Sequence, residues 1–252
     1  MKACLRRVFA LLLAVSLMIS TSGCATAIKK HPEFTERHKS INSVAVMPPE
    51  ITAYKLTFQG DKIPLHELIP VMEEITVSEI KAQFEKKGYN VNKLDLSESA
   101  LETNPDLRTA MFNVRKMFNK ALEDIQKGRQ KKFTYSLGSD VNVLADMANC
   151  DALIFVVEEG VKKSAGEIAK DMAQGVLLSA AALLIGVIVI PIPKTAATII
   201  HVAVVDANNG DILWYTNNKV SPDIDPENKG QLRSAVRGRV AGFPKIFSPK
   251  TK

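Results

Sequence analysis

The sequence contains few of the residues from which common catalytic and cofactor sites are built. Its three cysteines, Cys4, Cys24 and Cys150, lie far apart. Its four histidines are also scattered, so no cysteine–histidine cluster has the spacing of a zinc site: His31, His38, His66 and His201. The chain has no nucleophile elbow, phosphate-binding loop or dinucleotide fingerprint. These absences predict a non-enzymatic protein with no catalytic residues, cofactor or metal ion.

Residues 1–23 have the three-part pattern of an export signal. The basic residues Lys2, Arg6 and Arg7 precede an apolar stretch from Val8 to Ile19, and small residues follow. The apolar stretch is shorter than the roughly 20 residues that a membrane span requires. We therefore expect residues 1–23 to be removed as a signal peptide.

The segment Thr21-Ser22-Gly23-Cys24 resembles the lipobox of bacterial lipoproteins, although Thr21 stands where leucine is usual. In that group the cysteine thiol carries diacylglycerol and becomes the mature N-terminus. The resemblance implies lipid attachment, including an acyl chain such as palmitate, at Cys24. Ala25 stands where an acidic residue would favour the inner membrane, which implies the periplasmic face of the outer membrane. The alternative is ordinary cleavage after Ala27, which would give a soluble periplasmic protein.

Removal of the signal changes the charge and the cysteine chemistry of the chain. The formal net charge is +6, and Lys2, Arg6 and Arg7 contribute three units of it, which leaves about +3. So small a charge predicts no nucleic-acid partner. With Cys24 occupied by lipid, Cys150 has no disulfide partner, and the apolar run after it predicts a buried, unreactive thiol.

Hydrophobic periodicity and turn residues predict an α/β fold, with a small mixed sheet, flanking helices, and a C-terminal β-hairpin followed by a helix. The strands are expected at 43–47, 89–94, 152–157, 198–205 and 212–215, with a further strand or loop in 51–63. The turn Asp206–Gly210 has the Asn and Gly residues that a hairpin needs. Helices are expected at 70–88, 105–128, 139–147 and 229–241. We place the single periplasmic domain at 42–243, a flexible polar stalk at 24–41 and a basic tail at 244–252.

The helix expected at 105–128 has the clearest pattern, with an apolar stripe that indicates a face packed on the core. Basic residues surround its second half: Arg115, Lys116, Lys120, Lys127, Arg129, Lys131 and Lys132. We interpret them as a solvated face, and binding of an anionic polymer or headgroup is the alternative.

Two further segments have open interpretations. Glu158 and Glu159 follow the strand expected at 152–157, and we favour a solvated strand end over a catalytic carboxylate pair. Residues 175–193 contain no charge. We favour a helix followed by a strand, packed on its own domain or on a second subunit. The alternatives are a segment that enters a membrane as part of an oligomer and an independent membrane span.

Several segments together resemble a group of envelope lipoproteins that includes the curli-secretion channel lipoproteins, the penicillin-binding-protein activator lipoproteins and uncharacterised surface lipoproteins. The segments are Cys24, Ser43–Pro49, Gly88–Val91, Cys150–Phe155 and Val205–Trp214. The resemblance implies a small periplasmic α/β domain that works by protein contact. The helix at 105–132 and the insert at 175–193 have no counterpart in the group.

These features predict a lipid-anchored accessory protein that binds another envelope protein. The alternative is an oligomeric subunit of a secretion or transport assembly, with 175–193 associated with a membrane. A third hypothesis is a hydrolase with an unfamiliar site.

Overall fold

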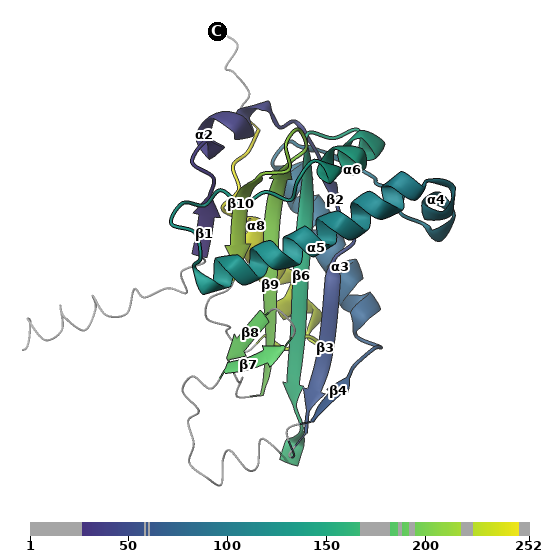
Figure 1. Ribbon diagram of the computed structural model, residues 1–252. Coiled ribbons are helices and arrows are strands. Elements are labelled where there is room, and N and C mark those ends of the chain that lie inside the picture. The colour runs from purple at the N-terminus through teal and green to yellow at the C-terminus, as the bar shows by residue number, and fades with distance from the viewer. Residues whose placement is uncertain are drawn as a thin grey trace, which may run out of the picture.

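The computed structural model describes residues 27–57, 59, 61–166, 182–185, 188–191, 195–217 and 224–246. Within these residues the chain forms an eight-stranded mixed sheet with helices on both faces (Figure 1). The fold is the predicted α/β class, including the C-terminal hairpin and the helix that follows it.

The sheet has the strand order β1-β10-β9-β6-β2-β5, and β3 pairs with β6 further along the same side as β2. The strands are β1 (Ala27–Lys30), β2 (Ser43–Val46), β3 (Glu50–Leu56), β4 (Lys62–Pro64), β5 (Asn90–Asn92), β6 (Ala152–Lys163), β9 (Ala196–Asp206) and β10 (Ile212–Asn217). Strands β2 and β3 run parallel to β6, whereas β9, β10 and β1 follow as antiparallel neighbours. One edge of the sheet is therefore β1, and β5 lies at the opposite edge.

Strands β6 and β9 form the centre of the sheet. They pair from Ala152 opposite Asp206 to Lys162 opposite Ala196, and all but one of the β6 residues and every β9 residue are buried. Strands covered on both faces require nearly continuous apolar sequence, which is the pattern that predicted them. Both are longer than predicted, because pairing on each side continues past the apolar runs.

The predicted hairpin turn joins β9 to β10. Gly210 has a φ of 73°, a left-handed conformation that glycine adopts without strain, and a side chain there would collide with the backbone of Gly138. The Asp206 carboxylate accepts a hydrogen bond from the Asn208 backbone N–H at 2.9 Å. This local chemistry confirms the turn prediction.

Two pairs of helices cover the sheet. Helices α3 (Ile69–Lys86) and α8 (Lys229–Val240) pack on one face, and α5 (Pro105–Lys127) and α6 (Asp140–Ala148) pack on the other. Short helical segments are α2 (Phe34–Arg37), η1 (His38–Ser40) and α4 (Glu98–Thr103). Helix α5 crosses the sheet from the side of α4 to the side of β1 (Figure 1).

Helix α5 begins and ends where its sequence predicts. The Asn104 side chain accepts a hydrogen bond from the Leu107 backbone N–H at 3.0 Å, and Gly128 ends the helix with a φ of 62°. Its predicted apolar stripe is buried against the sheet except for the partly buried Met111, and the Phe118 ring lies 5.2 Å from that of Phe155 on β6. The core face of this helix is thus confirmed.

The flexible stalk predicted for 24–41 is wrong for residues 27–41. Residues Ala27 to Lys30 pair with β10, and Phe34 is 4% exposed, with its ring 5.9 Å from that of Phe243. Backbone pairing and one buried aromatic ring hold this polar segment in place. The predicted basic tail also begins too early, because the Ile246 backbone N–H donates to the Lys87 carbonyl at 3.0 Å. Residues 24–26 and 247–252 lie outside the described residues.

The described part of the apolar insert is a hairpin of β7 (Ala182–Ile185) and β8 (Ile188–Pro191). The extended chain predicted for the end of the insert is present, but the helix predicted before it is wrong at 182–185. Short apolar runs have the same composition in strands and buried helices, which explains the error. Residues 175–181 lie outside the described residues, and no helix within the described ranges is long and apolar enough to cross a membrane.

Candidate functional site

The first candidate site is the edge of the sheet at which the chain emerges from its predicted lipid attachment. Cys24 lies outside the described residues, and β1 begins three residues later at Ala27. Three residue steps of fully extended chain span at most about 11 Å. A lipid on Cys24 would therefore hold the β1 edge close to a membrane surface.

Arg37 fastens the segment after β1 to the β9–β10 turn. Its guanidinium lies 2.6 Å from an Asp206 carboxylate oxygen and 2.8 Å from one of Asp211, and it donates to the Asn209 side-chain oxygen at 2.7 Å. Partial burial would lower the pKa of Arg37, but the hydrogen bonds to Asp211 and Asp206 raise it above its ordinary value. The cluster makes the start of the domain a fixed part of the fold.

The Arg37 cluster was not predicted from the sequence. The acidic turn was recognised only as a hairpin, and Arg37 was placed on a flexible stalk. The separation of 169 residues between Arg37 and Asp206 leaves no local pattern that joins them.

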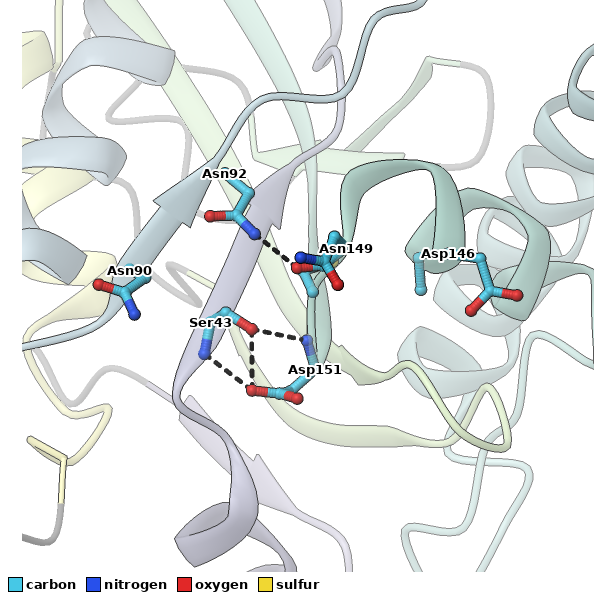
Figure 2. Close-up of a pocket in the computed structure, with 8 residues that line it drawn as sticks. Ser43, Asn90, Asn92, Asp146, Asn149 and Asp151 are labelled. Atoms are coloured by element: carbon cyan, nitrogen blue, oxygen red, sulfur yellow. Dashed lines mark hydrogen bonds between the residues drawn. The ribbon is translucent and has the colours of Figure 1, made fainter.

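A second candidate is a pocket of about 480 Å³ at the N-terminal ends of β2, β5 and β6 (Figure 2). Asp151 dominates it: one of its carboxylate oxygens accepts from the backbone N–H groups of Asn42 and Ser43 at 2.9 Å and from the Ser43 hydroxyl at 2.8 Å. Burial would raise the pKa of Asp151, but these hydrogen bonds lower it below its ordinary value. The arrangement joins the starts of two strands, which is a structural role.

Cys150, which also lines this pocket, is partly buried. Burial, together with the charge of Asp151, raises the pKa of its thiol to about 11. The thiol is therefore protonated at neutral pH, in agreement with the predicted unreactive cysteine.

The predicted solvated strand end at Glu158 and Glu159 is wrong, because β6 continues to Lys163. Glu158 is fully buried and accepts a hydrogen bond from the Thr76 hydroxyl at 2.7 Å, and Glu159 is 3% exposed. Burial raises the pKa of each carboxyl to about 8, although Thr76 opposes the shift at Glu158 and the charge of Lys62 opposes it at Glu159. Neighbouring residues of a strand point to opposite faces, so the two carboxyls do not form a catalytic pair.

His201 is buried in the centre of β9. Its Nδ1 lies 2.6 Å from the Tyr215 hydroxyl oxygen, and burial lowers its pKa to about 4, so the imidazole is neutral at neutral pH. His31 and His38 bond to nearby backbone groups of Glu33 and Phe34. Among the described residues, no three His, Cys, Asp or Glu side chains are placed to hold a metal ion.

A third candidate is a groove of about 620 Å³ between α5 and the start of β3. Phe112 borders it with 66% of its surface exposed, and Arg115 and Lys116 lie beside it. On the floor, Glu50 accepts a hydrogen bond from the Asn119 amide at 3.0 Å and lies 3.8 Å from Arg115. The groove thus combines one exposed aromatic ring with charged side chains.

No family model and no curated protein matches the sequence. Similar solved structures include a PelC dodecamer from Paraburkholderia phytofirmans, with 10% identity and a TM-score of 0.39 over 89% of this chain and 99% of that chain. Another is the lipoprotein GNA1162 from Neisseria meningitidis, with 15% identity and a TM-score of 0.30 over 80% of this chain and 98% of that chain. Similarities at this level assign neither a family nor a function to the chain.

Proposed function

We propose that this protein is a lipid-anchored component of the bacterial envelope that acts by binding another envelope protein and catalyses no reaction. The lipobox-like sequence ending at Cys24 carries the proposal. Buried acyl chains contribute roughly 0.8 kcal/mol for each CH₂ group, so several chains hold a protein on a bilayer essentially permanently. Ala25 favours the outer membrane, with the domain in the periplasm.

The groove beside Phe112 is the surface that we assign to the protein partner. Its exposed ring offers apolar area, and Arg115 and Lys116 favour a partner segment that combines apolar side chains with carboxylates. The groove lies between α5 and the start of β3. The C-terminal end of α5 lies on the other side of the sheet, beside the β1 edge (Figure 1). One helix thus separates the membrane attachment from the protein contact.

Site-specific crosslinking in the envelope tests the contact. A photoreactive phenylalanine derivative replaces Phe112 in one strain and Met147 in the control strain, since Met147 is 47% exposed on α6. The proposal predicts a discrete adduct with a second protein from position 112 and none from position 147. Free monomer at both positions would contradict it.

Fractionation tests the anchor separately. The wild-type protein is expected in the outer-membrane fraction, and Cys24→Ala is expected to leave it. An unchanged distribution of Cys24→Ala would show that the lipid on this residue does not hold the protein.

A second candidate function is a subunit of an oligomeric secretion or transport assembly. The charge-free sequence of 175–193 favours it, because so long an apolar segment requires cover from its own domain, from other chains or from a membrane. Sizing in mild detergent distinguishes the candidates: a large uniform oligomer that is lost when 175–193 is deleted supports the assembly. A crosslinked adduct of twice the chain mass at position 112 would point the same way.

A further inference from the structure

The loop after α5 lies against the β1 edge. The Lys29 ammonium donates to the Ile125 carbonyl oxygen at 3.4 Å, which joins β1 to the end of the helix. The Phe133 ring lies 6.2 Å from the ring of Tyr215, the residue that pairs with Lys29 across β10 and β1. The C-terminal end of α5 and the start of β1 are side by side in Figure 1.

This arrangement gathers basic side chains into one corner of the molecule, which we name the basic corner. It contains Lys29, Lys120, Lys127, Arg129, Lys131 and Lys132, against the two carboxylates of Glu123 and Asp124. Lys127, Arg129, Lys131 and Lys132 are all exposed. The corner therefore carries a strong positive charge on a chain whose overall charge is small.

The carboxylates of the corner do not neutralise it. Glu123 pairs with Lys127, and Asp124 pairs with Arg129 at 2.8 Å. In the part of the chain that the structure describes, no carboxylate lies within ion-pair distance of Lys131 or Lys132. These two ammonium groups remain available to an anionic partner.

We propose that the basic corner docks on the anionic phospholipid headgroups of the membrane that holds the protein, an inference that rests on the proposed lipid attachment at Cys24. A lipid on that residue lies within about 11 Å of Ala27 along the chain. Electrostatic attraction extends over a Debye length of about 8 Å at physiological ionic strength. The anchor and the corner are thus close enough to act on one surface, and together they fix which side of the domain faces the bilayer.

Limited trypsin digestion of the acylated full chain on vesicles tests this orientation. The vesicles contain phosphatidylcholine alone or phosphatidylcholine mixed with phosphatidylglycerol. Trypsin cuts after Lys131 and Lys132 in the corner and after Lys93, an exposed residue that follows β5 at the opposite edge. We expect the anionic lipid to slow cleavage in the corner about fivefold or more, with little change at Lys93.

Charge reversal gives the matched comparison. In Lys131→Glu/Lys132→Glu, the corner sites that remain after Lys127 and Arg129 should be cut equally fast on both kinds of vesicle. In Lys86→Glu/Lys93→Glu, which alters two exposed lysines near β5, protection of the corner should persist. Melting curves of both variants verify that they fold.

The outcomes separate the two proposals. A chain that floats with both kinds of vesicle but is cut in the corner at the same rate on each would overturn the orientation and leave the anchor standing. A chain that does not float with phosphatidylcholine vesicles would overturn the anchor, and the orientation with it.

Discussion

The two edges of the sheet are fastened by different chemistry. At the β1 edge, the charged cluster of Arg37, Asp206 and Asp211 holds residues that precede the predicted domain. At the β5 edge, the uncharged Asn92 amide donates to the Ala148 and Asn149 carbonyl oxygens at 3.1 and 2.5 Å. Charged contacts therefore hold the edge that we assign to the membrane, and uncharged hydrogen bonds hold the other.

Helix α5 connects the two sides and presents a different surface to each. Its C-terminal end contributes to the basic corner, and its N-terminal half carries the exposed Phe112 beside the start of β3. One amphipathic helix thus both covers the core and separates the two contact surfaces that we propose. The following predictions test how strongly each side depends on its own contacts.

The largest effect on the free energy of unfolding is expected from the buried face of α5. Phe118 is 1% exposed and packs on Phe155, so Phe118→Ala should lower the free energy of unfolding by about 3–5 kcal/mol. Phe112→Ala, on the exposed face, should change it by less than about 0.5 kcal/mol. Chemical denaturation in mild detergent measures both, and equal losses would show that the two faces are not distinct.

The next effect on the free energy of unfolding is expected at the β1 edge, from loss of the Arg37 cluster. Arg37→Ala leaves two partly buried carboxylates without their cation and should cost about 2–3 kcal/mol, since part of the cluster is solvated. The exposed pair of Lys39 with Glu36 gives the control, because Lys39→Ala should cost less than about 1 kcal/mol. Trypsin should also cut residues 29–39 faster in Arg37→Ala than in Lys39→Ala, and equal rates would exclude Arg37 as the fastening residue.

Strand β6 lies between the two edges, and its contribution to stability should depend on pH rather than on salt concentration. The pKa of Glu158 is about 8 in the fold against an ordinary value of 4.5. The folded state binds the proton more tightly, so stability falls as pH rises from about 4.5 to about 8, by about 1.4 kcal/mol for each pKa unit. Glu158→Gln should be more stable than the wild type by about 4 kcal/mol at pH 8 and little changed at pH 4.5. Chemical denaturation across this pH range measures the difference in the free energy of unfolding between the variant and the wild type. A difference that does not change with pH would contradict a buried, protonated carboxyl at Glu158.

The smallest effect is expected at the β5 edge. Asn92→Ala removes two uncharged hydrogen bonds at a partly exposed position and should cost about 1 kcal/mol. Added salt should leave this cost unchanged and should reduce the cost of Arg37→Ala. A similar salt dependence for both variants would remove the proposed difference between the edges.

The sequence contained enough local information to predict most elements. Asn104, Pro105 and Gly128 mark the ends of α5, and the Asn-Asn-Gly turn marks the hairpin, because each depends on residues a few positions apart. Strand β1 was missed because its polar sequence gains order from β10, whose residues lie far along the chain. The buried positions of Glu158 and Glu159 were missed for the same kind of reason, since β3 and β9 extend β6 past its apolar run.

The candidate surfaces were only partly predictable. The basic residues around the end of α5 were visible in the sequence, but their position beside β1 depends on the tertiary contacts of Lys29 and Phe133. The exposure of Phe112 next to the start of β3 also requires the fold, because sequence periodicity places a residue on a helix face without showing what covers it.

Mass spectrometry of the processed N-terminus tests the central claim most directly. The account predicts a mature chain that starts at Cys24 and carries diacylglycerol on its thiol. An unmodified chain that starts at Ile28 would contradict it, since nothing would then hold the β1 edge at a membrane.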